Sequence, residues 1–205
     1  MYIGTVFALS SDSDFGFSCL ITFSKYHGLG NDFILFDDPD GHLREKLTAE
    51  RIRALCHRQT GIGADGILVR TKEQGGADHR MLLFNADGSP AEISGNGLRC
   101  FVLFLRERGY PVDLELAIET GGGIQRARLL DDHTVESTMP SPTFTGGQGG
   151  VKPVELREKD QTFPVISVNV GNPHGVIFGP ERDIPFAKTY GPGLEKNSAF
   201  PAGAN

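Results

Sequence analysis

Residues Leu98 to Arg108 are mostly apolar and contain neither glycine nor proline. They directly follow Ser94-Gly95-Asn96-Gly97, whose small and polar residues are typical of a turn. An apolar run of this kind predicts a helix that is buried on nearly every side. The remaining elements of the domain are therefore expected to surround this helix.

Ser94 stands at the predicted N-terminus of that helix, and the residues around it allow two interpretations. In the first, its hydroxyl caps the helix by accepting a hydrogen bond from a backbone amide. In the second, Gly95 and Gly97 let a ligand approach the backbone, and the free amides of the first turn hold an anionic group. The sequence pattern alone leaves both open.

Composition limits the class of protein. A chain of 205 residues with 39% hydrophobic residues can bury a sizeable core, in one large domain or two small ones. The net charge of −6 disfavours nucleic acid and anionic membrane surfaces as partners. Three widely spaced cysteines, Cys19, Cys56 and Cys100, favour a reducing compartment over disulfides or a metal site, so we expect a cytoplasmic protein.

The chain before the helix alternates strands with turns. Strands are predicted at Ile21 to Tyr26, at Phe33 to Phe36 and at Met81 to Phe84, and a helix is predicted from Thr48 through Arg58. The segment Gly61-Ile62-Gly63-Ala64-Asp65-Gly66 matches G-x-G-x-x-G, but it follows a helix and precedes a strand. That order is the reverse of a dinucleotide-binding unit, so we reject NAD and FAD binding.

After the helix the pattern predicts a hairpin and then a second domain. Strands Leu114 to Glu119 and Gln125 to Leu130 flank three glycines, and the Pro- and Gly-rich stretch Met139 to Gly150 is the expected boundary. Strands are predicted again at Val165 to Val170 and Val176 to Phe178. We expect an extension over residues 1–20, a first domain over 21–138 and a partial second domain over 139–205.

Five motifs, in this order along the chain, resemble those of the diaminopimelate epimerases. The first two are His-Gly-Leu-Gly-Asn-Asp-Phe, which starts at His27, and Gly-Ile-Gly-Ala-Asp, which starts at Gly61. The third starts at Asn85 with Asn-Ala-Asp-Gly-Ser and continues through Gly-Asn-Gly to Arg-Cys; the fourth is Gly-Asn-Pro-His at Gly171, and the fifth is the segment that ends at Asn205. The resemblance extends from about Ile21 to Asn205. It implies an α/β (α+β) fold of two similar domains, each a curled mixed sheet around a central helix, with the second domain incomplete.

The resemblance also implies which residues form a site. Ser94 occupies the position of the family's first reactive cysteine, and His174 is expected near the reacting centre. The substrate-binding positions that match are Asn31, Asn85, Gly95, Asn96, Asn172 and Asn205. The family's second cysteine falls beyond Asn205, and no metal or cofactor is expected.

Three functions are compatible with these residues. The first is cofactor-independent epimerisation of LL-diaminopimelate to meso-diaminopimelate by two-base proton transfer, in lysine and cell-wall precursor synthesis, with a homodimer expected at full length. The second is a related isomerase or racemase acting on another amino acid. The third is a catalytically inactive binding module on the same scaffold, which the hydroxyl of Ser94 favours because it ionises far less readily than a thiol.

Overall fold

The computed structural model describes residues 7–9, 21–112, 114–131, 133–144, 151–201 and 203–204. The chain divides into two compact units, Met1–Met139 and Pro140–Asn205. Within the described ranges, no helix is both long enough and apolar enough to cross a membrane.

The first unit contains a nine-stranded mixed sheet. Its strands are β1 (Phe7–Leu9), β2 (Ile21–Gly28), β3 (Asn31–Asp37), β4 (Gly66–Thr71), β5 (His79–Asn85), β6 (Pro90–Ala91), β7 (Leu116–Thr120), β8 (Gly123–Leu129) and β9 (Val135–Ser137). They lie in the order β1-β2-β3-β4-β5-β7-β8-β9, with β6 beside β5. The β3–β4 and β5–β7 pairs are parallel and the others antiparallel.

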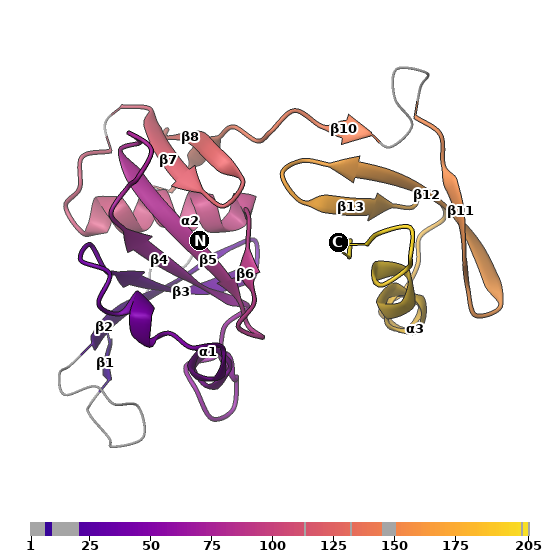
Figure 1. Cartoon of the computed structure of the whole chain (residues 1–205), viewed down its shortest axis with the longest axis horizontal. Helices are drawn as coiled ribbons and strands as arrows, with labels where there is room; N and C mark the ends of the chain where they lie inside the picture. Colours follow the sequence, from indigo (N-terminus) through magenta and orange to yellow (C-terminus); the bar gives the residue numbers. More distant parts are fainter. Residues whose placement is uncertain are drawn as a thin grey trace. The chain divides into compact units, whose positions relative to one another are not determined.

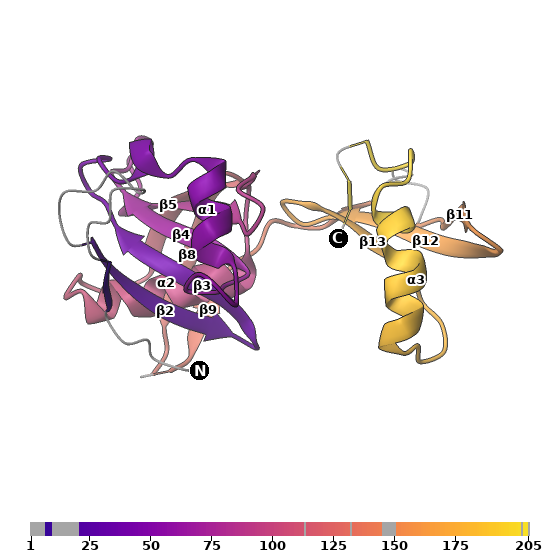
Figure 2. The same cartoon turned by 90° about the horizontal axis from the view of Figure 1, so that it is seen from below.

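Helix α2 (Gly95–Glu107) forms the centre of this unit. Its apolar side chains from Leu98 to Leu105 are buried, as the sequence predicted. The helix contacts β2, β3 and β5, and it also contacts β8 and β9 at the other end of the strand order. Strands so far apart in a sheet can touch one helix only if the sheet curls around it, and this curl is visible in Figures 1 and 2.

The sheet is covered on its other face by helix α1 (Ala49–Cys56), which follows the short 3₁₀ helix η1 (Arg44–Lys46). Buried residues of β3 alternate between the two faces: Phe33 and Leu35 pack in the core cluster of α2, whereas Ile34 and Phe36 pack in that of α1. This alternation follows from the period of two residues in a strand. Strand β3 is therefore apolar on both faces.

The helix and strand boundaries refine the predictions. Helix α2 begins at Gly95, three residues before the apolar run, because Ser94 rather than a later residue caps it. Helix α1 was predicted to reach Arg58 but ends at Cys56, since His57 has an extended backbone. In the predicted extension over residues 1–20, Phe7–Leu9 pair with β2, and the other residues lie outside the described ranges.

The second unit is built on a smaller, four-stranded sheet. Its elements are β10 (Thr143–Phe144), β11 (Val154–Glu158), β12 (Gln161–Asn169), β13 (Pro173–Val176) and helix α3 (Ile184–Glu195). A small core of Leu156, Phe163, Val165 and Phe200 packs against partly buried side chains of α3. Unlike α2, helix α3 has no buried residue, so a second domain similar to the first stays a prediction.

One predicted strand in this unit is wrong. Residues Val176 to Phe178 were predicted to pair, but the strand runs from Pro173 to Val176. Its register places Pro173 opposite Asn169 and Val176 opposite Ile166, because a tight turn at Gly171 lets β13 begin pairing with β12 at Pro173. Phe178 lies beyond the pairing and is exposed.

A polar cluster lies at one end of the first sheet. The guanidinium of Arg70 pairs with Asp37 at 2.8 Å, and the hydroxyl of Tyr110 donates to the other carboxylate oxygen of Asp37 at 3.0 Å. His79 is buried beside them, 3.5 Å from Arg70 Nε. Burial, and then the charge of Arg70, lower the pKa of His79, so its imidazole is held neutral.

The neutral His79 predicts that the protein loses stability on acidification. Because the folded-state pKa of His79 lies below its unfolded value of about 6.5, the unfolded chain binds more protons below that pH, and the free energy of unfolding falls as the pH drops. We expect His79→Gln to flatten this dependence in urea melts between about pH 5 and 7. The matched control is His133→Gln at an exposed position; an equal flattening in both variants would contradict the assignment.

Candidate functional site

The N-terminus of α2 combines a capped end with open amides. Ser94 has extended backbone angles, and its Oγ accepts a hydrogen bond from the Gly97 amide at 3.0 Å, which is the geometry of an N-cap. Among the described residues, nothing accepts a hydrogen bond from the amides of Gly95 or Asn96. These two amides lie at the positive end of the helix dipole and can bind an anionic group.

The β2–β3 hairpin carries Asn31 to the same place. Gly28 pairs with Asn31, and both residues between them, Leu29 and Gly30, have positive φ angles of 56° and 88°. This is the backbone of a tight hairpin turn that follows the twist of the strands. A Cβ on Gly28 would lie 3.2 Å from Cβ of Asn96, so the hairpin end packs directly on the first turn of α2.

The side chains of Asn31 and Asn96 are hydrogen-bonded to each other. Asn96 Nδ2 donates to Asn31 Oδ1 at 3.3 Å, and Asn31 Nδ2 donates to Asp65 Oδ2 at 3.0 Å. Arg99, one turn further along α2, donates to Oδ1 of Asn96. Both asparagines are half-buried.

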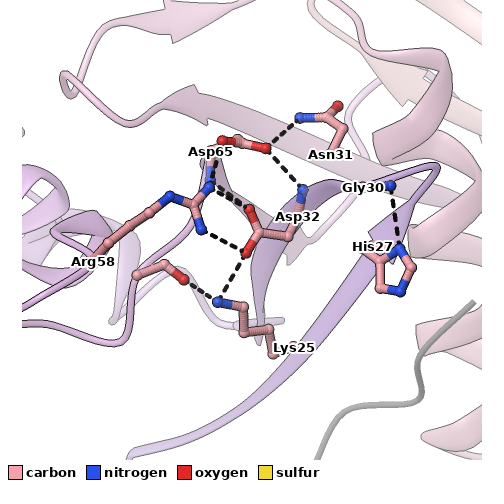
Figure 3. A network of polar contacts seen from close by, with 8 residues as sticks. Lys25, His27, Gly30, Asn31, Asp32, Arg58 and Asp65 are labelled. Carbon is pink, nitrogen blue, oxygen red and sulfur yellow. Dashed lines mark hydrogen bonds and ion pairs between the residues drawn. The ribbon is translucent and has the colours of Figure 1, made fainter.

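Asn31 lies at the edge of a network of charged side chains, which it joins through Asp65 (Figure 3). Arg58 Nη2 lies 2.8 Å from Asp32 Oδ1 and 2.7 Å from Asp65 Oδ1, and Lys25 Nζ lies 2.9 Å from Asp32 Oδ2. Burial alone would raise the pKa of Asp32, but hydrogen bonds and charges from Arg58 and Lys25 outweigh it and hold that pKa well below its ordinary value. The sequence did carry a signal for the two carboxylates, since Asp32 lies in the motif that starts at His27 and Asp65 ends the motif Gly-Ile-Gly-Ala-Asp.

Asn85 lies at the same end of the sheet as Asn31. It ends β5, opposite Gly66 of β4, and Gly66 also pairs with Phe33 on the other side. Asn85 Nδ2 donates to Ser89 Oγ at 3.0 Å within its own turn, and the residue is exposed. A Cβ on Gly66 would lie 2.5 Å from the carbonyl oxygen of Phe84, so only glycine fits between these strands.

The remaining predicted residues belong to the second unit. Asn172 and His174 lie together at the β12–β13 turn, with His174 Nε2 at 3.0 Å from Asn172 Oδ1. Both are half-buried. Asn205 lies outside the described residues.

The described cysteines are not part of these sites. Cys56 and Cys100 are both buried in core clusters. Burial raises the pKa of Cys56 to about 11 and that of Cys100 to about 12. Neither thiol is therefore available as a thiolate near neutral pH.

A cavity of about 420 Å³ lies at the opposite end of β4 from Gly66. Its charged lining residues are Asp40, Arg44, Glu45, Lys72, Glu73 and Arg80. Acidic and basic groups are equal in number there, and none of the predicted site residues lines it. The candidate site is therefore the end of the sheet that holds Asn31, Asn85 and the start of α2.

Solved structures with a similar fold define the class. A probable proline racemase from Agrobacterium radiobacter K84 superposes with a TM-score of 0.59 at 17% identity, covering 77% of this chain and 51% of that chain. A PhzF-family phenazine biosynthesis protein from Bacillus anthracis superposes with a TM-score of 0.52 at 20% identity, covering 99% and 63%. The chain thus has the curled mixed α/β fold of these proteins.

Sequence comparison identifies one family within that class. The profile of the family described as diaminopimelate epimerase matches residues 23–145. The diaminopimelate epimerase of Desulforudis audaxviator is 39% identical over 193 residues, and that of Nostoc punctiforme is 38% identical over 196 residues. These alignments cover 89% and 90% of this chain, and 69% and 70% of the two relatives. The chain belongs to the diaminopimelate epimerase family, which confirms the resemblance seen in its motifs.

The capping role of Ser94 predicts a stability effect that is independent of any activity. Ser94→Ala removes the acceptor of the Gly97 amide and should lower the free energy of unfolding by about 1 kcal/mol. Thr48→Ala, which removes the cap of α1 at Arg51, is the matched comparison and should have a similar effect in urea melts. An unchanged stability of Ser94→Ala would show that the hydroxyl does not cap α2 in solution.

Proposed function

We propose that this chain carries the first domain and part of the second domain of a cofactor-independent epimerase that interconverts LL- and meso-diaminopimelate. Membership of the family supports the proposal. The observation that carries it is the placement of Ser94 at the cap of α2, next to the open amides of Gly95 and Asn96, the second of which is hydrogen-bonded to Asn31 through its side chain. In the same proposal, the full-length protein is a cytoplasmic homodimer that serves lysine and peptidoglycan precursor synthesis.

Inversion of an α-carbon without a cofactor needs two groups on opposite faces of the substrate. One removes the α-proton and the other delivers a new proton to the opposite face. Negative charge then develops on the α-carbon and its carboxylate. The amides of Gly95 and Asn96, together with the dipole of α2, are placed to stabilise that charge.

Ser94 takes the position of one of these two groups. Its Oγ accepts from the Gly97 amide, which leaves the hydroxyl hydrogen free to be donated. A hydroxyl is a poor base near neutral pH, so Ser94 is suited to deliver a proton rather than to remove one. The sequence has no cysteine after Cys100, so the second group of the family's pair is not among these 205 residues.

Two other functions belong to different classes. A related racemase of another amino acid would use the same asparagines and amides with a different side-chain pocket. A binding module without catalysis is favoured by the hydroxyl of Ser94, which is a poor base near neutral pH. Binding and proton exchange, measured separately, distinguish these functions.

We expect the 205-residue chain to show no exchange of the α-proton of diaminopimelate with solvent, because neither thiol of the reactive pair is present. The measurement is deuterium wash-in by mass spectrometry in deuterated water, with the Nostoc punctiforme relative as the positive control. Calorimetry with meso-diaminopimelate tests binding in parallel. Wash-in catalysed by the unmodified chain would overturn the role given to Ser94, and wash-in from another amino acid instead would favour the racemase.

In a longer form of the protein that includes the second cysteine, Ser94→Cys should act on one direction of the reaction. The new thiol speeds proton abstraction from the isomer whose α-hydrogen faces residue 94, with little change in KM, because the contacts of Asn31, Gly95 and Asn96 are untouched. Deuterium wash-in from each pure stereoisomer measures the effect. Ser141→Cys, at an exposed position, is the control; equal gains from both isomers, or none, would leave Ser94 as a helix cap only.

A further inference from the structure

Four side chains at the candidate site form one continuous hydrogen-bonded relay. It runs from the carboxylate of Asp65 through the amides of Asn31 and Asn96 to the guanidinium of Arg99. The first two contacts measure 3.0 Å and 3.3 Å. The relay joins the Gly-Ile-Gly-Ala-Asp motif, which ends at Asp65, to the β2–β3 hairpin and the first turn of α2.

The two ends of the relay have opposite hydrogen-bonding character. The carboxylate of Asp65 can only accept hydrogen bonds, and the guanidinium of Arg99 can only donate them. An asparagine amide has nearly the same shape in its two orientations, so contacts alone decide which one it adopts. Here Asn31 must turn its nitrogen to Asp65, and Asn96 must turn its oxygen to Arg99. The remaining oxygen and nitrogen then meet in a correct hydrogen bond between the two asparagines.

Asp65 is itself held in place through both of its oxygens. Arg58 lies 2.7 Å from Oδ1, and the backbone amide of Asp32 donates to Oδ2 at 3.0 Å. The backbone amide of Asp65 in turn donates to Asp32, to the carbonyl oxygen at 2.9 Å and to Oδ1 at 3.1 Å. Arg58 pairs with Asp32 as well, so the two carboxylates share one cation. The carboxylate that faces Asn31 thus has a fixed position.

We propose that Asp65, held by Arg58, is a positioning residue that sets the orientation of the Asn31 amide and so keeps the Asn31 oxygen facing Nδ2 of Asn96, whose own orientation is fixed by Arg99. The inference rests on the proposed function insofar as these asparagines contact the amino acid. With one hydrogen of Nδ2 committed to Asp65 and one lone pair of Oδ1 committed to Asn96, Asn31 offers a ligand one donor and one acceptor in fixed directions. The relay therefore determines the donor and acceptor pattern that the first unit presents to a zwitterionic ligand.

Asp65→Asn tests this inference because it changes hydrogen-bonding character with almost no change of shape. An amide at position 65 can donate as well as accept, so the nitrogen of Asn31 is no longer held by a partner that only accepts. Arg99 still orients Asn96, but Nδ2 of Asn96 loses its acceptor whenever the Asn31 amide turns. We expect the side-chain NH₂ signals of both asparagines to shift in the ¹⁵N–¹H spectrum of the full chain, including those of Asn96, which does not contact residue 65. The affinity for meso-diaminopimelate should fall about tenfold.

Glu136→Gln is the matched control, because it also removes an exposed carboxylate paired with an arginine, Arg128, in the same unit. It should change neither the asparagine signals nor the affinity. A folded Asp65→Asn variant with unmoved Asn96 signals would overturn the relay. An affinity equal to that of the unmodified chain would overturn the positioning role.

The unmodified chain provides a second measurement that needs no variant. The NH₂ hydrogens of Asn31 and Asn96 should exchange with solvent more slowly than those of free asparagine, and exchange at the free rate would overturn the relay even if Asp65→Asn fails to fold. If the unmodified chain does not bind meso-diaminopimelate, the proposed function fails. The NMR signals still decide the relay in that case, so the two failures can be told apart.

Discussion

The burial of the apolar run of helix α2, from Leu98 to Leu105, determines the architecture of the first unit. A helix that is apolar on most of its surface must be covered on most sides, and strands from both ends of the sheet order contact it. The sheet curls for this reason. A helix whose sides are covered can present polar groups only at its ends, so the open amides of Gly95 and Asn96 are the part of α2 that can meet a ligand.

At the end of the sheet that holds the candidate site, side chains from both faces of the sheet come together. The residue pair Asn96 and Arg99 belongs to α2 on one face, whereas Arg58 follows α1 on the other. Asp32 and Asp65 lie at the edge where β3 and β4 begin, and they connect the two. Because β3 and β4 are parallel and adjacent, their first residues are neighbours, and this pairing brings the carboxylates to one arginine.

Local patterns in the sequence predicted what local interactions determine. The apolar run predicted α2, and the residue type of Ser94 made a helix cap one of its two interpretations. The network around Arg58 was not predicted, since it joins residues that are 26 positions apart in the chain and depends on strand pairing. The placement of Asn31 and Asn96 within a site came from resemblance to a family, because an asparagine in a turn has no local feature that distinguishes a ligand contact from a turn residue. The end of α1 and the bounds of β13 were predicted wrongly, since hydrogen bonds at the ends of elements decide them rather than the apolar pattern.

The two described cysteines divide between the two core clusters of the first unit, with Cys100 on the α2 side of the sheet and Cys56 on the α1 side. A thiol-reactive reagent can reach either sulfur only when the layer above it opens. Labelling rates at the two sulfurs, separated by peptide mapping, would thus give an opening free energy for each layer. The native chain already carries one buried cysteine in each core cluster of the first unit, so the opening free energies of the two layers can be compared without introducing a further cysteine.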